Sequence, residues 1–479
     1  MTTSYGDWDL VIGLEVHAQL LTRTKLFCGC ATSFGDPPNT HVCPTCLGLP
    51  GALPTLNERA VELAVRAGVA LGCAIERRSV FARKSYFYPD SPKGYQITQY
   101  ELPYARHGKL AVGSGAEIRI LRIHMEEDAG KSVHAPGGAS RVDLNRAGTP
   151  LVEIVSEPDL RSAEDASDYL KRLRDVLMFV GANDGNLEQG NFRCDANVSV
   201  RRRGDEKLGV RSELKNINSF RFVEEAIDVE ARRQIAELEA GRTLRQCTRG
   251  YNADARSTYL LRDKENDAGY RYFPDPDLLP LELSDARIDE IAAALPALPD
   301  ARRARYTTEL GLTEYAAGVL VSHPAIAAFF EAAVAAGADP ARAGNFIQAE
   351  VLRDAKLHGV EGEMPITPAQ LAGVFALVDA GTISGKQAKE VYAKLVGTAK
   401  SPADVVAELG LAMMSDEGAL TAAIQKVIDA NAKQAASYRA GKTQLLGFFI
   451  GQVMKETKGS ANPALANELV KRALEGGST

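Results

Sequence analysis

The chain has 479 residues, which is too long for a single hydrophobic core and predicts two to four domains. Hydrophobic residues make up 45% and charged residues 25% of the chain, a composition that excludes intrinsic disorder and a fibrous repeat. The net charge of -6 excludes a surface that is basic all over, so any contact with nucleic acid must use local basic patches.

The N-terminus shows no export or membrane signal. No basic stretch leads into an apolar one there, and no window of about 18 uninterrupted apolar residues occurs in the sequence. We therefore expect a cytoplasmic protein that makes no use of a membrane.

Residues 1–295 predict an α+β domain built on an antiparallel sheet. Short runs that alternate apolar and polar residues are typical of strands with one buried face. Such runs lie at residues 10–20, 118–127 and 193–201. Helical periodicity occurs at residues 57–71, 163–180 and 222–240. We expect these helices to cover the sheet.

The composition changes near Leu295, where a Pro-rich stretch leads into Ala-rich sequence of helical character. This change predicts a second, all-α domain over residues 296–405. A further break around Pro402 separates residues 406–479, which again have a helical pattern and end in Gly and Ser. We expect these residues to form a small helical tail domain.

Four of the seven cysteines crowd between residues 28 and 46 as two closely spaced pairs. They are Cys28, Cys30, Cys43 and Cys46. Four thiolates on tight turns are the preferred ligands of structural zinc, and they leave no position for a catalytic water. The alternative is a set of reduced, metal-free cysteines. Cys73, Cys194 and Cys247 have no such neighbours and are expected to be small core residues.

Polar residues recur at every second position of the predicted strands, so they share one face of the sheet. This face would carry Glu15, His17, Gln19, Arg193, Asp195, Asn197, Ser199, Arg211, Glu213 and Lys215. Alternation of this kind more often means a solvated sheet face. Here the acids come with His, Asn and Ser, and carboxylates held together require a neutralising cation.

We therefore expect a site for a magnesium nucleotide on this face. The candidate catalytic residues are Glu15, His17, Lys84, Glu126, Glu127, Asp195, Glu213 and Lys215. Within this set the expected magnesium ligands are Glu15, His17, Glu127 and Glu213, while the choice between Glu126 and Glu127 stays open. The lysines would neutralise charge on a transferring phosphoryl group. Two glycine-rich stretches, at residues 113–115 and 441–443, lack the spacing of phosphate-binding loops.

The tail contains a group of cations that is a candidate contact for a polyanion. It comprises Lys433, Arg439, Lys442, Lys455 and Lys458, against the single acid Glu456. Such a group is usually only a solvated helix face. In an acidic protein it also offers phosphates a place to bind, among Gly and Thr residues that allow close backbone approach.

Several segments, in order and at plausible spacing, resemble the B subunit family of the glutamyl-tRNA(Gln)/aspartyl-tRNA(Asn) amidotransferase. They are residues 12–20, the two cysteine pairs through residue 51, and residues 83–90, 123–131, 143–151, 271–278 and 447–463. The resemblance covers essentially the whole chain. One departure is Gly269 before Tyr270, where the family pattern has Asp, and it affects only a local contact.

The resemblance implies a cradle-like N-terminal domain that uses ATP to phosphorylate the side-chain carboxylate of Glu or Asp misacylated on tRNA. It also implies a heterotrimer, in which an amidase-type A subunit releases ammonia from glutamine and a small C subunit joins A to B. The ammonia reaches the activated carboxylate through a channel. A non-discriminating aminoacyl-tRNA synthetase is a further candidate partner, and the family's tail domain contacts the body of the tRNA.

Two other functions compete with this interpretation. The first is a tRNA-binding scaffold that has lost its chemistry, although a scaffold has no reason to keep the acid, His and Lys set. The second is a free-standing ATP-dependent ligase that acts on a metabolite, which the tail domain disfavours. The sequence shows no Ser/Lys amidase stretch and no isolated Cys with a His context, so this chain alone is not expected to hydrolyse glutamine.

Overall fold

The computed structural model describes residues 5–134, 138–263, 270–411, 417–457, 461 and 463–475. The chain forms two compact units. One comprises Met1–Arg302 with His358–Val360, and the other Arg303–Leu357 with Glu361–Thr479. The predicted domain boundaries at residues 295 and 405 remain predictions.

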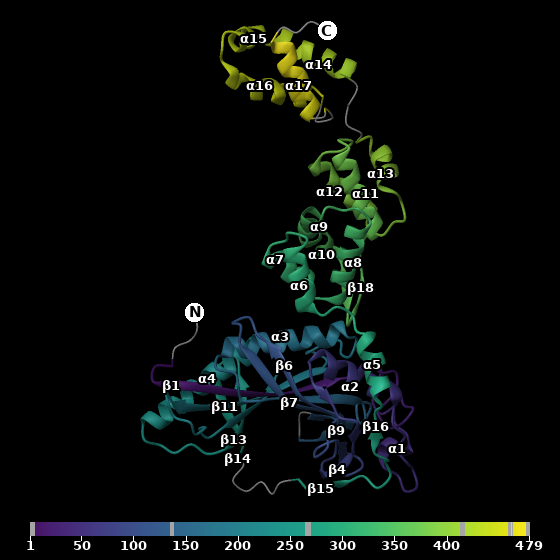
Figure 1. The fold of residues 1–479 in the computed structure, drawn as a ribbon, viewed down its shortest axis with the longest axis vertical. Helices are drawn as coiled ribbons and strands as arrows, with labels where there is room; N and C mark the ends of the chain where they lie inside the picture. The colour runs from purple at the N-terminus through teal and green to yellow at the C-terminus, as the bar shows by residue number, and fades with distance from the viewer. Residues whose placement is uncertain are drawn as a thin grey trace. The chain divides into compact units, whose positions relative to one another are not determined.

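Unit 1 is built on a large sheet, which has twelve strands in the part of the chain that the structure describes (Figure 1). The main path runs β14-β13-β12-β11-β1-β10-β7-β5-β4-β15. Off this path, β6 pairs with β7 and β2 pairs with β6. The strands are β1 (Trp8–Gln19), β2 (Ala74–Ile75), β4 (Ala82–Ser85), β5 (Tyr95–Thr98), β6 (Ala105–Ala111), β7 (Glu117–Glu127), β10 (Pro150–Ser156), β11 (Phe192–Arg202), β12 (Ser212–Ile217), β13 (Cys247–Asn252), β14 (Ser257–Asp263) and β15 (Tyr272–Pro274).

The predicted antiparallel sheet is confirmed, with one parallel pair, β12 and β13, among the described strands. A parallel pair needs a long crossover between its strands, and α4 (Phe220–Glu239) provides it. Smaller ribbons join β3 (Arg78–Ser79) to β16 (Leu281–Glu282) and β8 (Lys131–His134) to β9 (Ser140–Asp143).

One face of the sheet is packed against helices and the other carries the polar residues. In β1 the side chains of Leu10, Ile12, Leu14, Val16 and Ala18 are buried. They belong to one core with apolar residues of α2 (Glu58–Ala70), α3 (Ala163–Phe179) and α4. The side chains of Asn57, Ser162 and Ser219 cap these helices, because each accepts a hydrogen bond from the first turn. The three helices lie where the sequence predicted them.

Unit 1 also contains two shorter helices, α1 (Pro44–Leu47) and α5 (Asp285–Ala293), and Ile291 of α5 belongs to the same core. The remaining helix of the boundary region is α6 (Pro299–Thr308). A hairpin turn at residues 112–116 joins β6 to β7, so the glycine-rich stretch there is not a phosphate-binding loop.

Unit 2 is largely helical, with one short ribbon of β17 (Lys356–His358) and β18 (Glu361–Glu363) at its boundary. Its helices before the tail are α7 (Glu314–Leu320), α8 (Pro324–Ala335), α9 (Pro340–Phe346), the π-helix η1 (Ile347–Val351), α10 (Leu352–Asp354), α11 (Pro368–Asp379), α12 (Gly385–Leu395) and α13 (Pro402–Leu409). No single helix among the described residues is long and apolar enough to cross a membrane; α7 and α8 pass that test only together, across a bend of 113°.

The last helices share a hydrophobic cluster of their own. They are α14 (Glu417–Ala430), α15 (Ala432–Arg439), the short η2 (Thr443–Leu445), α16 (Leu446–Glu456) and α17 (Pro463–Leu474). Fully buried residues such as Leu420, Phe449, Val453 and Val470 form this cluster. A core of this kind is what a separate tail domain requires.

Candidate active site

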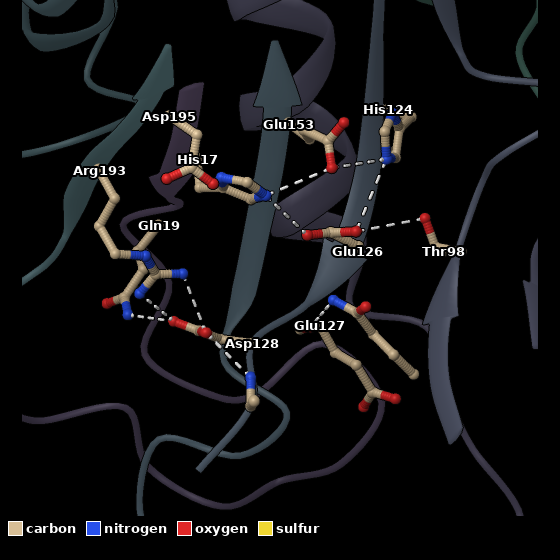
Figure 2. A network of polar contacts seen from close by, with 12 residues as sticks. His17, Gln19, Thr98, His124, Glu126, Glu127, Asp128, Glu153, Arg193 and Asp195 are labelled. Atoms are coloured by element: carbon tan, nitrogen blue, oxygen red, sulfur yellow. Dashed lines mark hydrogen bonds and ion pairs between the residues drawn. The ribbon is translucent and has the colours of Figure 1, made fainter. Parts of the chain in front are cut away.

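The polar face of the sheet gathers histidines and carboxylates from three adjacent strands. The register places His17 of β1 opposite Glu153 of β10, and Glu153 opposite His124 of β7. Glu15 and Glu126 each lie two positions from one of these histidines, so they share its face. Figure 2 shows His17, His124, Glu126 and Glu153 pointing toward one another.

The distances in this group, which we call the acid–histidine cluster, are short. Nε2 of His17 is 3.3 Å from a carboxylate oxygen of Glu153 and 3.5 Å from one of Glu126. Nε2 of His124 is 3.6 Å from an oxygen of each of the same two acids. Three side chains, Glu15, His17 and Glu153, have donor atoms that all lie within 4.8 Å of one another. The same holds for the donor atoms of His124, Glu126 and Glu153. This geometry is able to hold a metal ion.

The electrostatics of the cluster favour positive charge beside its carboxylates. Burial lowers the pKa of His17, but the hydrogen bond and charge of Glu153, together with Glu126, raise it to about 9. Burial opposes the ionisation of Glu153, but the charges of His124, His17 and Lys84 hold its pKa well below the usual range. Without a metal, His17 therefore carries a proton at neutral pH and Glu153 is ionised.

A second group of charges lies beside the cluster. Asp195 of β11 stands opposite Glu15 of β1, and its carboxylate accepts a hydrogen bond of 2.6 Å from the Lys215 ammonium. Glu213 of β12 is 3.3 Å from the same ammonium and accepts a bond from the hydroxyl of Thr248. Although burial lowers the pKa of Lys215, Asp195 and Glu213 raise it above its usual value. The predicted ligand Glu213 thus lies against Lys215, outside the acid–histidine cluster.

Glu126 and Glu127 are consecutive in β7 and point to opposite faces of the strand. The structure brings Glu126 to the histidines. Glu127 is 4% exposed, forms an ion pair with the Lys93 ammonium, and accepts a 2.9 Å hydrogen bond from the backbone N–H of Ile97. Sequence reasoning had left the choice between these two acids open.

Asp128 ends the acidic run and anchors a network at the edge of the cluster (Figure 2). The Arg193 guanidinium donates to both of its oxygens at 2.9 and 3.0 Å, and the Gln19 amide donates at 2.8 Å. Burial raises the pKa of Asp128, but Arg193 and Arg146 outweigh burial and hold that pKa below its usual value. The carboxylate is therefore ionised in the folded protein at neutral pH.

Asp128→Asn is expected to destabilise unit 1 by about 1–3 kcal/mol at pH 7, because it removes the charge of the buried carboxylate to which the half-buried Arg193 guanidinium donates. The pKa of the Asp128 carboxyl is lower in the folded protein than in the unfolded chain. Its charge therefore adds to the free energy of unfolding at pH values above the unfolded-state pKa, and this contribution is lost as pH falls through the folded-state pKa. The difference in unfolding free energy between parent and variant should thus stay constant from neutral to mildly acidic pH and shrink below about pH 4. Urea unfolding at a series of pH values measures it, with the exposed Asp205→Asn as control. A difference that persists unchanged at the acid end would contradict this account.

Two clefts meet at the acid–histidine cluster. Both are lined by His17, Arg146, Arg193, Lys215 and Asn216. The first continues along the loops at residues 184–191 and 216–218. The second continues past Lys84, Tyr86 and Tyr270. Cations and amides thus surround the point where the two clefts join, as anionic substrates require.

Lys84 reaches the second cleft from β4, where it pairs with Tyr272 of β15 in the sheet register. Its ammonium lies 4.6 Å from the centre of the Tyr270 ring. The charge of Lys84 also contributes to the low pKa of Glu153. Lys84 therefore supplies positive charge next to the cluster without an ion pair among the described residues.

The four clustered cysteines come together, and Cys46 lines the second cleft. The sulfurs of Cys28, Cys30, Cys43 and Cys46 lie within 4.8 Å of one another. Cys43 caps helix α1, and its backbone N–H donates to the Cys46 sulfur at 3.1 Å. Four thiol ligands converging on one point match the donor set of a closed structural zinc centre. Cys194 and Cys247 are buried and Cys73 is half-buried, away from this group.

Sequence reasoning missed His124, Glu153 and Lys93. His124 precedes Glu126 by two positions, and the same alternation that grouped Glu15 with His17 would have found it. Glu153 is the single acid in an otherwise apolar strand, which was an available signal. Lys93 lies in a loop before β5, and no sequence pattern marked it as a site residue. Its pairing with Glu127 depends on how the chain returns to the sheet.

In the tail, Lys433, Arg439, Lys442 and Lys455 are exposed. The stretch's single acid, Glu456, lies 2.6 Å from the Lys426 ammonium, so its charge is already balanced. Arg439 also donates to the carbonyl of Leu474 at 2.9 Å. The fifth predicted cation, Lys458, lies outside the described residues.

Comparison with known proteins supports these observations. A family model described as "GatB/GatE catalytic domain" matches residues 10–289, and one described as "GatB domain" matches residues 328–474. The chain is 55% identical to a protein of Anaeromyxobacter dehalogenans (strain 2CP-1 / ATCC BAA-258), over 98% of this chain and 99% of that protein. It is 51% identical to a protein of Myxococcus xanthus, with the same coverage of both chains. Both relatives are named as B subunits of the aspartyl/glutamyl-tRNA(Asn/Gln) amidotransferase, and the chain belongs to that family.

Proposed function

We propose that this chain uses ATP and Mg²⁺ to phosphorylate the side-chain carboxylate of Glu-tRNA(Gln), Asp-tRNA(Asn) or both. As an amidotransferase B subunit it belongs to a glutamine-dependent ligase that converts these tRNAs to Gln-tRNA(Gln) and Asn-tRNA(Asn). A carboxylate oxygen attacks the γ-phosphorus, and the bond to the leaving ADP breaks. Ammonia then attacks the acyl carbon and inorganic phosphate leaves, which forms the amide.

The acid–histidine cluster carries this proposal. Hard oxygen donors with one histidine suit Mg²⁺, and we assign Glu15, His17, Glu126 and Glu153 to it. Glu127 and Glu213 were predicted as ligands from the sequence, but they form ion pairs with Lys93 and Lys215. We propose that they hold these lysines in place and do not bind the metal. A bound Mg²⁺ would offset the negative charge of the transferring phosphoryl group.

The two clefts match the two anionic substrates of such a reaction, ATP and the aminoacyl end of the tRNA. His17, Arg193 and Lys215 line both clefts and stand where the substrates must meet. Lys84 and Lys215 bring positive charge to the transferring group, and Asp195 holds the Lys215 ammonium in place through their 2.6 Å bond. Catalysis of phosphoryl transfer is mostly such positioning and charge stabilisation.

Ammonia comes from a partner in this proposal. The relatives' names designate a B subunit, which supports a complex with an amidase-type A subunit and a small C subunit. The side chains of Cys194 and Cys247 are each 7% exposed, so neither resembles the open thiol of a glutaminase nucleophile. A non-discriminating aminoacyl-tRNA synthetase is a further proposed partner. The cysteine group is the proposed site of structural Zn²⁺.

The decisive experiment measures ATP cleavage by the assembled complex with misacylated tRNA, uncharged tRNA or no tRNA. We expect cleavage to depend on misacylated tRNA and on this chain, and to need Mg²⁺. A complex that binds misacylated tRNA but cleaves no ATP would show that the chain is a tRNA-binding scaffold. ATP cleavage driven equally well by a free amino acid would instead indicate a metabolite ligase.

We propose that the tail binds the body of the tRNA through its exposed cations, away from the reacting end. A complex in which this chain ends at Leu411, after α13, should show a raised KM for misacylated tRNA and unchanged glutamine hydrolysis. The slope of log affinity against log salt should become shallower by about 0.7–0.9 for each phosphate that the protein no longer binds. The control is Lys400→Ala, because Lys400 is an exposed cation that precedes the tail and pairs with Glu408. If the truncated and the full-length complex bind tRNA with equal affinity at every salt concentration, the tail does not bind the tRNA.

A further inference from the structure

Lys25 is a buried lysine that pairs with no carboxylate in the part of the chain that the structure describes. Its side chain is 1% exposed. Its ammonium donates to the carbonyl of His41 at 2.7 Å and of Leu144 at 3.2 Å, and to the sulfur of Cys46 at 3.8 Å. Among the described residues, no acidic side chain forms an ion pair with it. A buried ammonium is costly unless a negative charge compensates it.

The cysteine group provides that charge. Four thiolates around one divalent ion leave a net negative charge on the centre, and Lys25 touches one of the four sulfurs. The same sulfur accepts a bond from the backbone N–H of Cys43. Donors around the ligands of a metal centre fix their orientation and adjust their charge.

Lys25 also ties the cysteine segment to a second loop, residues 144–149. Beside the bond to Leu144, the backbone N–H of Leu26 donates to the Gly148 carbonyl at 2.9 Å. At Gly148, which has a φ of +87°, an added Cβ would lie 3.4 Å from the Lys25 side chain, so the two are closely packed. Lys25 therefore lies at the junction of three segments: its own, the one at residues 41–46 and the 144–149 loop.

The 144–149 loop borders both reaction clefts through Arg146. The Arg146 guanidinium donates to the carbonyls of Ala129 and Gly130 at 2.9 and 2.8 Å and lies 3.6 Å from Asp128. The backbone N–H of Gly148 donates to the Asp128 carbonyl at 2.8 Å. A displacement of this loop would thus reach the end of β7, directly after Glu126 and Glu127.

We infer that Lys25 is a positioning residue that joins the cysteine centre to the reaction clefts. Its ammonium balances the charge of the thiolates and at the same time holds the 144–149 loop by the Leu144 carbonyl. The part of the inference that concerns the clefts rests on the proposed function, whereas the part that concerns the metal centre does not.

Lys25→Met and Lys25→Gln test the inference in the assembled complex; Met removes charge and donors, and Gln keeps donors without charge. We expect both variants to transfer zinc to a chromogenic chelator faster, by about 10–100-fold for Met and less for Gln. In the cobalt-substituted protein, the thiolate-to-metal charge-transfer band should move to lower energy, because the sulfurs lose a neighbouring positive charge. A purely structural lysine would not shift this band.

The clefts provide a second measurement. Both variants should raise the KM for misacylated tRNA in ATP cleavage more than they lower kcat, because the loop is displaced while the acid–histidine cluster is intact. Lys109→Met, an exposed cation of β6 paired with Glu117, is the matched control and should change nothing. Parental zinc release and an unshifted band in both Lys25 variants would overturn the inference. Since zinc release does not depend on ATP cleavage, that failure is distinct from a failure of the proposed function.

Discussion

Glu126→Gln is expected to lower misacylated-tRNA-dependent ATP cleavage by about 10²–10³-fold. The amide keeps the shape of the side chain but removes the negative charge that lies 3.5 Å from His17 and 3.6 Å from His124. With one charge fewer the site holds Mg²⁺ less tightly, so part of the rate should return at raised Mg²⁺ concentration. The measurement is the rate of ATP cleavage by the assembled complex against Mg²⁺ concentration.

Glu117→Gln is the matched control, since Glu117 lies on the same strand but is exposed and paired with Lys109. It should cleave ATP at the parental rate. Glutamine hydrolysis by the partner subunit should be unchanged in both variants, which shows that the complex assembles. Parental ATP cleavage in Glu126→Gln at low Mg²⁺ concentration would remove Glu126 from the metal site, and the same result with Glu153→Gln would remove the site itself.

Local sequence patterns predicted much of unit 1. The alternation in residues 10–20 correctly placed Glu15 and His17 on one face and the core residues on the other, because side-chain direction in a strand depends only on its period. The three helices of the core carried a clear 3.6-residue period and capping residues, and they begin and end within about two residues of the prediction.

Contacts between distant segments could not be predicted in this way. The group formed by His17, Glu153 and His124 depends on β10 lying between β1 and β7, which pairs His17 with a residue more than a hundred positions away. No local signal specifies that register. The parallel pairing of β12 and β13 and the approach of Lys93 to Glu127 likewise follow from the path of the chain, so an alternating pattern cannot reveal them.

The cysteine pairs are the opposite case, because their local spacing predicted convergence that the structure shows. Cys43→Ser is expected to abolish stable zinc binding and to make residues 28–57 sensitive to proteases. A structural zinc centre contributes about 10–16 kcal/mol in zinc-finger peptides, so its loss removes most of what orders a segment with little core of its own. Zinc content after dialysis and limited proteolysis of the complex measure both effects, and Cys73→Ser, outside the group, is the control.

The local structure explains why this segment depends on the metal. Helix α1 has four residues, far fewer than the number at which a helix is stable by itself, and its N-cap is Cys43. Cys28, Cys30 and Cys43 are half-buried and lie outside the hydrophobic core that the described residues of unit 1 form. The main sheet has its own large core, so ATP cleavage by Cys43→Ser should be reduced through the 144–149 loop and not abolished. A parent protein that contains no zinc after purification without chelators, or a Cys43→Ser protein with parental protease resistance, would show that packing alone orders the segment.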